Sequence, residues 1–407
     1  MLIKRLYISA LFLFCIFALQ TAAKAQNIIL QEMEAVTVEA KRTDYFTNAG
    51  STTIDSLTLS IIGSGDIGQS LKALGAAEVK SYGASGSLST VNLRGAGSEN
   101  TSVNFNGFAL NSISTGSMDL SLLPSAFFET IQIIPGAEAG LFGSGTFGGA
   151  VTLNSFSDKY SSGSKIWASS EIGSFANQKY SIGGYIKNPT FQYKTSALLH
   201  KARNDFPFIN KYKIGQPEEI REHNAFQMYS MLHSAKINLS ARDKLEASAM
   251  IFSKEMQIPE VTASSGKNYK MQRDSGIYIT VRYNKLLNNS RINTGTAVFL
   301  DALNYTDRSS ETSDNLSVNS QIKAIRLMND FSYRRYLSKA LTSESGFSIN
   351  FLKAESNNYP KTPNEINGNL FSALKYSYQT WTFKLTGRAE LSEYYKIKPI
   401  ISGGILY

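Results

Sequence analysis

From residue 156 onward, apolar and polar side chains alternate in successive segments of about ten residues. The alternation is clearest in 179–186, 277–284 and 382–391, where every second position is apolar or glycine. Side chains of a β-strand point alternately to its two faces, so each segment predicts a strand with one apolar and one polar face. No run of about 18 apolar residues follows residue 25, which excludes helical membrane spans. Such strands cross a lipid bilayer only as a closed β-barrel.

The connections between these segments alternate in length. A membrane barrel has short turns at its periplasmic end and longer loops at its outer end. A soluble β-sandwich, which is the alternative, would have loops of more uniform length. Short turns are expected at 174–176, 240–243, 288–289 and 338–339, and long loops at 204–222, 257–273, 307–315 and 356–367.

The stretch before residue 156 has a different pattern, in which glycine, asparagine and proline separate short β-prone runs. This pattern predicts a small α+β unit whose bends are set by glycine. Helical spacing predicts a helix in Gly68–Leu74 and one or two helical turns in Leu120–Phe127. The expected strands are Glu78–Tyr82, Val91–Arg94, Ser102–Phe105, Thr130–Ile134 and Ala150–Asn154.

Gly143, Gly145 and Gly148 have the G-x-G-x-x-G spacing of dinucleotide-binding loops. That chemistry requires a strand before the glycines and a helix after them, whose N-terminus holds the phosphates. The residues that follow, Ala150–Leu153, are β-prone instead. We therefore interpret the glycines as a turn and exclude nucleotide binding.

Four motifs of this unit, VNLRG, NFNG, LLPSAFFETIQIIPG and GLFGSGTFGGAVTLNS, occur in the order found in one known family. Val91–Ser155 resembles the plug domain of TonB-dependent outer-membrane receptors, most of all the cobalamin-receptor (BtuB-like) and siderophore-receptor branch. Asn106 stands where the family usually has Asp, and Ala137–Ala139 replaces a Pro-Ala-Ser run. The resemblance implies that residues 43–155 form a plug. Its motif residues are Arg94, Gly95, Asn106, Gly107, Pro135, Gly136, Gly143, Gly145, Gly148 and Gly149.

The resemblance also implies that two plug loops, 82–89 and 111–117, lie at the apex of the plug and face the ligand. The implied ligand is a small metal chelate, either a siderophore or a corrinoid such as cobalamin. The ligand-facing residues expected in these loops are Tyr82, Ser85, Ser87, Asn111, Ser114 and Thr115.

Residues 1–25 are predicted to be a cleaved signal peptide, with a basic Lys4-Arg5 start, an apolar run and an Ala-x-Ala site at Ala23–Ala25. Cys15, the single cysteine, lies inside it, so the mature chain has none for disulfides or thiolate metal sites. The core of the next segment, 26–42, resembles the TonB box, an extended peptide that adds a strand to a sheet of TonB in the energy-transducing inner-membrane complex. A strand of the plug itself is the alternative. The expected box consists of Glu34, Ala35, Val36, Thr37, Val38, Glu39 and Ala40.

Residues 156–407 are expected to form only part of a barrel. We count about twelve strands there, whereas barrels that hold a plug have about 22. A closed barrel of about twelve strands is too narrow for a plug of over ~100 residues, because the diameter grows with strand number. The predicted fold is therefore a small α+β plug domain followed by an incomplete antiparallel transmembrane β-barrel, and we expect the chain to be a fragment or a truncated gene product.

Charge is unevenly distributed along the chain. Residues 44–156 contain three basic and eight acidic residues, a net charge of −5, whereas 157–407 contain 33 basic and 21 acidic residues, a net charge of +12. One hypothesis is that barrel-wall Arg282, Lys384 and Arg388 face the acidic plug across a wet interface. The other is that the excess lies in outer loops and binds anionic lipopolysaccharide. The barrel pattern argues against nucleic acid, the usual partner of a basic chain.

No cofactor and no catalytic constellation is expected, because His200, His223 and His233 lack metal-ligand spacing and the carboxylates are dispersed. We expect a monomeric transport protein and not an enzyme. It would lie in the outer membrane of a Gram-negative bacterium and import a metal chelate into the periplasm with energy from TonB. The alternative is a non-transporting outer-membrane binding protein or adhesin, or a truncated receptor fragment.

Overall fold

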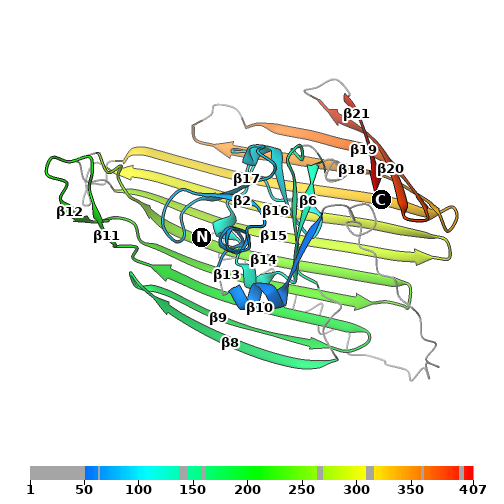
Figure 1. Ribbon diagram of the computed structural model, residues 1–407, viewed down its shortest axis with the longest axis horizontal. Helices are drawn as coiled ribbons and strands as arrows, with labels where there is room; N and C mark the ends of the chain where they lie inside the picture. Colours follow the sequence, from blue (N-terminus) through cyan, green and yellow to red (C-terminus); the bar gives the residue numbers. More distant parts are fainter. Residues whose placement is uncertain are drawn as a thin grey trace. The chain divides into compact units, whose positions relative to one another are not determined.

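The computed structural model describes residues 51–62, 65–136, 143, 145–156, 162–263, 269–308, 316–358, 362–393 and 398–406. All of them belong to one unit, Arg42–Tyr407. They form a five-stranded sheet, a twelve-stranded sheet and two small two-stranded sheets (Figure 1). The predicted signal peptide and the expected TonB box, Glu34–Ala40, lie outside the described residues.

The smaller sheet is the centre of the plug, with strand order β1-β6-β7-β4-β5. Only β4 and β7 pair in parallel; the other neighbours are antiparallel. Among the described residues, no helix is long and apolar enough to span a membrane. The plug elements are β1 (Thr52–Asp55), α3 (Ser56–Ile62), α4 (Ile67–Ala73), β2 (Glu78–Ser81), β3 (Ser89–Asn92), η2 (Ser98–Asn100), β4 (Thr101–Phe105), β5 (Phe108–Ala109), η3 (Leu120–Leu122), η4 (Ser125–Phe127), β6 (Thr130–Pro135) and β7 (Gly149–Asn154).

The predicted α+β unit is confirmed. Strands β2, β3, β4, β6 and β7 overlap the five expected strands, and the expected turns at Leu120–Phe127 are the two 3₁₀ helices η3 and η4. Helix α4 begins one residue earlier than predicted, after Asp66, whose side chain accepts a 2.8 Å hydrogen bond from Gln69 N. This N-cap satisfies a backbone donor at the start of the helix. Helix α3 and strand β1 were not predicted.

Asn106 and Gly107 form the two-residue turn between β4 and β5, with φ angles of 49° and 93°. Positive φ angles at both central residues are typical of a type I′ turn, which suits a two-residue β-hairpin, and Asn-Gly is its preferred sequence. The Asn106 Nδ2 also donates to Thr280 Oγ1 in the large sheet at 3.1 Å, while its Oδ1 accepts from Ser155 N at 3.0 Å. An aspartate, usual here in the family, has no such donor when ionised.

The larger sheet is antiparallel throughout, and its strands follow chain order. A separate hairpin, β11 (Pro207–Ile209) with β12 (Glu218–Ile220), lies in the connection between β10 and β13. The twelve strands are β8 (Gly163–Gly173), β9 (Asn177–Lys187), β10 (Phe191–Ala202), β13 (Phe226–Asn238), β14 (Asp243–Ile258), β15 (Lys270–Leu287), β16 (Ser290–Arg308), β17 (Leu316–Tyr336), β18 (Leu341–Ser356), β19 (Asn364–Tyr378), β20 (Trp381–Ser392) and β21 (Lys398–Leu406).

The sheet is not closed into a barrel. Within the described part of the chain, β8 pairs only with β9 and β21 only with β20. The expected fold, a plug followed by an incomplete antiparallel barrel of about twelve strands, is confirmed.

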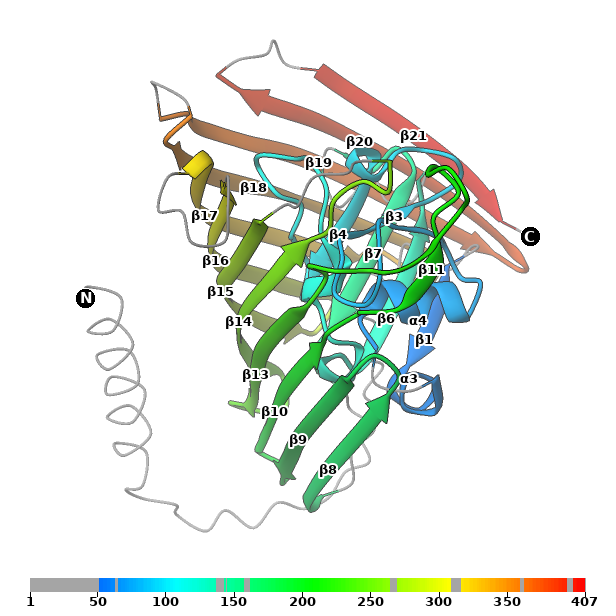
Figure 2. The same cartoon turned by 90° about the vertical axis from the view of Figure 1, so that its left-hand side faces the viewer.

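Burial alternates along the central strands β10, β13 and β15, as the sequence predicts. On β15, Tyr278 is 2% exposed and the next residue, Ile279, is 41% exposed. The sheet curves, and the plug strands lie against its concave face (Figure 2). We call this concave face, which includes Tyr278, the inner wall.

One apolar cluster joins the plug to the inner wall. Phe105, Phe127 and Phe128 of the plug belong to the same buried cluster as Phe252, Tyr278 and Phe299 of the wall. Tyr278 stacks edge-on against Phe252, with ring centroids 5.3 Å apart. The expectation of a wet interface is therefore wrong for this part of the contact, because moving the plug would expose these rings to water.

The long connections leave one end of the sheet, which we call the long-loop edge, and most of the short turns leave the other end. The turn 174–176 departs from this rule, because it is short but lies at the long-loop edge. Its Phe175 carbonyl accepts hydrogen bonds from Arg203 N and Asn204 N, at 3.0 Å and 3.3 Å, in the first long loop. Its predicted grouping with the turns 240–243, 288–289 and 338–339 was wrong.

Candidate functional site

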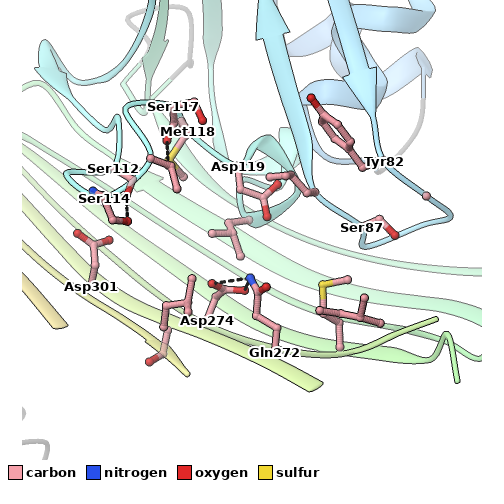
Figure 3. A pocket seen from close by; sticks show the side chains of 18 of the residues that line it. Tyr82, Ser87, Ser112, Ser114, Ser117, Met118, Asp119, Gln272, Asp274 and Asp301 are labelled. Carbon is pink, nitrogen blue, oxygen red and sulfur yellow. Dashed lines mark hydrogen bonds between the residues drawn. The ribbon is translucent and has the colours of Figure 1, made fainter. Parts of the chain in front are cut away.

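A cavity of about 860 Å³ lies between the plug and the inner wall at the long-loop edge (Figure 3). Its volume lies within the range of small-molecule binding sites. Two plug loops, 82–88 and 112–119, form one side. Residues of β14 to β18 and of the connection between β10 and β13 form the other. Tyr82, Ser87, Ser114 and Thr115, four of the predicted ligand-facing residues, line this cavity.

The other two predicted ligand-facing residues hold the loops in place instead of lining this cavity. Asn111 accepts a 2.8 Å hydrogen bond from Val103 N and donates to the carbonyls of Thr101 and Gly116, at 3.0 Å and 2.9 Å. The Ser85 carbonyl accepts a 2.9 Å hydrogen bond from Asn204 Nδ2 of the first long loop.

The plug motif residues lie outside the lining of the cavity, and several of them shape turns. Arg94 is exposed and has a φ of 55°, next to Gly95 at 73°. Gly148 leaves no room for a side chain, since a Cβ there would be 2.8 Å from the Leu93 carbonyl oxygen. Strand β7 follows the glycines, where a dinucleotide-binding loop would have a helix.

Three carboxylates line the cavity. Asp119 belongs to the plug, and Asp274 and Asp301 belong to β15 and β16 of the inner wall. Asp301 accepts hydrogen bonds from Tyr278 Oη and from Arg326 Nη2, the latter at 2.9 Å. Arg326 also donates to the Asn111 carbonyl at 2.8 Å, so this wall arginine fixes the base of a plug loop.

Two buried ion pairs between described residues join the wall to the plug. Lys254 Nζ on β14 lies 2.9 Å from Asp119 Oδ2, and the lysine side chain is fully buried. Lys194 on β10 pairs with Glu129 of the plug, with side chains 5% and 1% exposed. Neither lysine was predicted from the sequence as a plug contact. The only sequence feature that could have indicated them is that both lysines occupy inward-facing positions of strands with alternating polar and apolar residues.

The predicted contact of Arg282 with acidic plug residues was wrong in its chemistry. Arg282 contacts the plug through the Asn106 carbonyl, at 3.3 Å, and the Phe108 ring. Its ion pair is with Asp330 of the wall, at 2.9 Å. Arg388 lies beside Gly143 of the plug and pairs with Glu390 of its own strand. Within the described part of the plug, the carboxylates of Asp119 and Glu129 are paired with Lys254 and Lys194 instead.

The β11–β12 hairpin contributes to the rim of the cavity. Phe208 and Arg221 both line it, and the Arg221 guanidinium lies over the Phe208 ring, 5.9 Å from its centroid. Lys213 and Asn210 donate to Glu219, and these hydrogen bonds hold the pKa of Glu219 below its ordinary value.

Comparison with known proteins gives the same class as the fold. Residues 45–150 match the family model described as TonB-dependent Receptor Plug Domain. The vitamin B12 transporter BtuB of Vibrio vulnificus (strain YJ016) is 36% identical over 83 residues, which cover 20% of this chain and 14% of that protein.

Solved receptors share the fold at low sequence identity. A mutant of the ferric enterobactin receptor PfeA from Pseudomonas aeruginosa is 12% identical, with a TM-score of 0.67, covering 88% of this chain and 59% of that chain. The FrpB iron transporter from Neisseria meningitidis is 11% identical, with a TM-score of 0.69, covering 88% and 60%. The siderophore receptor PirA from Acinetobacter baumannii is 13% identical, with a TM-score of 0.64, covering 88% and 58%.

The fold is that of the plug-and-barrel proteins. The resemblance predicted from the sequence is confirmed: the chain carries the plug domain of the TonB-dependent receptors, a family of receptors and not of enzymes, followed by part of a barrel. The chain spans about 60% of the solved receptors and 14% of the vitamin B12 transporter.

Proposed function

We propose that the protein is an outer-membrane receptor that binds a small metal chelate from outside the cell and passes it to the periplasm. The observation that carries this proposal is the cavity of about 860 Å³ at the long-loop edge, with plug loops on one side and the inner wall on the other. A site placed there receives a ligand from the side of the long loops. In a receptor with a complete barrel, the ligand would reach the periplasmic side when the plug moves.

The proposed energy source is TonB. The segment Glu34–Ala40 would bind it as an added strand, because Val36 and Val38 alternate with polar residues and the backbone supplies the hydrogen bonds. A pull on this segment would reach the plug directly, since the plug begins a few residues later in the chain.

The proposed location is the outer membrane, with a monomeric receptor in contact with lipid and lipopolysaccharide. Its support is the outward face of the strands, where large apolar side chains are exposed. Ile279, Leu385 and Ile182 are 41%, 53% and 58% exposed. A soluble protein would not arrange so many of them on one face of one sheet.

The ligand is proposed as a class, a siderophore or a corrinoid. Among the similar proteins, PirA is named as a siderophore receptor and BtuB as a vitamin B12 transporter. The cavity lining combines aromatic rings, hydroxyl groups and carboxylates, which suits a chelate with both apolar and polar surface.

The test compares uptake with binding in cells that produce the full-length protein. The variants Val36→Pro and Val38→Pro remove a strand N–H and are expected to abolish uptake of radiolabelled ferric chelates or cyanocobalamin while binding is kept. Val36→Ala, which keeps the N–H, is the matched control and should transport. Binding without uptake in the unchanged protein would identify a non-transporting receptor. Absence of binding to every chelate would overturn the proposal.

A further inference from the structure

Asp274 is a buried carboxylate at the wall of the cavity. It is 8% exposed and lies on the inner wall, among the residues that line the cavity (Figure 3). Its hydrogen bonds come from the neighbouring Gln272, whose Nε2 lies 2.9 Å from Oδ2 and 3.2 Å from Oδ1. A neutral amide compensates a buried negative charge poorly, because buried charges are normally matched by a cation or a metal.

The nearest candidate cation is already committed to the plug. Lys254 is the cross-strand partner of Asp274 in the β14–β15 register. Its ammonium group donates to Asp119 Oδ2 at 2.9 Å, Ser121 Oγ at 2.7 Å and the Gly86 carbonyl at 3.1 Å. A lysine has three donors, and these contacts use all of them.

The other two carboxylates that line the cavity each have a cationic partner. Asp119 has Lys254, and Asp301 has Arg326. Arg221 at the rim lies over the ring of Phe208. Asp274 is thus the lining carboxylate without an ion-pair partner among the described residues, and it stands beside apolar wall residues such as Phe252.

We propose that Asp274, together with Gln272, is the specificity-determining pair of the site and receives an ammonium or amide N–H group of the chelate. The proposal rests on the receptor function proposed above. The site therefore takes neutral or cationic amphipathic chelates that present an N–H donor. It disfavours polyanionic chelates such as ferric tris-catecholates, whose charge is repelled by Asp274 in a poorly hydrated site.

The test uses four probes and the full-length receptor in detergent micelles. Ferrioxamine B carries a free ammonium group and its N-acetyl derivative does not; cyanocobalamin is neutral with amide N–H groups, and ferric enterobactin is polyanionic. The unchanged protein is expected to bind one of the first three at least about tenfold more tightly than ferric enterobactin.

Three variants separate charge from fold. Asp274→Asn is expected to weaken the preferred probe about tenfold and to narrow its advantage over ferric enterobactin, whereas Asp274→Glu keeps most of the preference. Glu218→Gln, an exposed carboxylate of β12 outside the cavity lining, should change nothing. If ferrioxamine B binds, its advantage over the N-acetyl derivative should disappear in Asp274→Asn.

Each outcome bears on one of the two proposals. A preference of the unchanged protein for ferric enterobactin would overturn the role of Asp274, and so would equal losses for all probes in Asp274→Asn. In both cases the receptor function stands. Failure of the unchanged protein to bind any of the four probes would count against the receptor function itself, and the proposal for Asp274 would fall with it.

Discussion

Lys254 of the wall reaches into the plug and forms an ion pair with Asp119, with 2.9 Å between Nζ and Oδ2. The same carboxylate accepts hydrogen bonds from Ser89 N and Ser121 N, both at 3.0 Å. One plug residue therefore ties together strand β3, the 3₁₀ helix η3 and the wall beside the cavity. Because Asp119 also lines the cavity, a ligand bound there would lie close to a contact that holds the plug to the wall.

Replacing Lys254 with methionine should weaken the docking of the plug. The change leaves Asp119 without its cation, and breaking one side of a buried ion pair costs about 3 kcal/mol. We expect a lower free energy of unfolding in urea titrations in micelles and faster tryptic cleavage within the plug.

The control for Lys254 is Arg273→Met. Arg273 pairs with Glu255 on the same pair of strands, but both side chains are well exposed, at 63% and 41%. Exposed pairs contribute between about 0 and 1 kcal/mol, so this change should leave cleavage nearly unaffected. Equal effects of the two substitutions would show that the Lys254 contact does not hold the plug.

The second buried pair, Lys194 with Glu129, should show strong coupling in a double-mutant cycle. Lys194→Met alone leaves a carboxylate with 1% exposure next to an apolar side chain and should cost about 3 kcal/mol. Adding Glu129→Gln removes the charge, so the double variant should recover about half or more of the loss. Urea titrations would measure the free energy of unfolding of each variant. If the loss in the double variant equalled the sum of the two single losses, the two side chains would not be energetically coupled.

The Asn106-Gly107 turn should tolerate no side chain at Gly107. A Cβ there would be 2.7 Å from Arg282 Nη2, and the φ angle of 93° is unfavourable for any residue with a Cβ. Gly107→Ala should therefore destabilise the protein by about 2 kcal/mol. It should also displace Arg282, whose contact with Asp330 could be followed by comparing crystal structures.

Gly387→Ala provides the control for this turn. Gly387 lies in β20, its φ is not positive, and a Cβ there would have no atom within 4 Å. The expected change in the free energy of unfolding is within about 0.5 kcal/mol. If both alanine variants behaved alike, the argument from the geometry of the turn would fail.

The local sequence pattern predicted most of the strands and turns. It could not predict the contacts between residues that are far apart in the sequence. Alternation predicted the strands because a strand's two faces depend only on its own sequence. Asn-Gly and the other turn residues predicted the bends of the plug for the same reason. By contrast, nothing near Lys194 or Lys254 in sequence points to Glu129 or Asp119, which lie 65 and 135 residues away. Asn106 and Thr280, which share a hydrogen bond, are 174 residues apart. The cavity likewise brings together residues from distant parts of the chain, such as Tyr82, Ser114 and Asp274.

The last prediction concerns pH and Asp66, the N-cap of α4. Burial raises the pKa of Asp66 from 3.8 to about 6, against the opposing effect of the hydrogen bond from Gln69 N, and the nearby Asp119 raises it further. A carboxyl whose pKa is higher in the folded state binds its proton more tightly there. It therefore adds stability below about pH 4, and this contribution is lost as the pH rises through about 6.

Asp66→Asn removes this dependence because an asparagine stays neutral and still accepts the capping hydrogen bond. Between pH 4 and pH 7 the unchanged protein should lose about 2 kcal/mol of unfolding free energy relative to the Asn variant. Urea titrations in micelles at the two pH values would measure this difference. Asp55→Asn, which alters the cap of α3 where Asp55 accepts from Thr58 N, controls for the loss of a capping carboxylate. A difference between Asp66→Asn and the unchanged protein that stayed constant from pH 4 to pH 7 would mean that Asp66 is ionised in the plug at both, and that burial does not hold its proton.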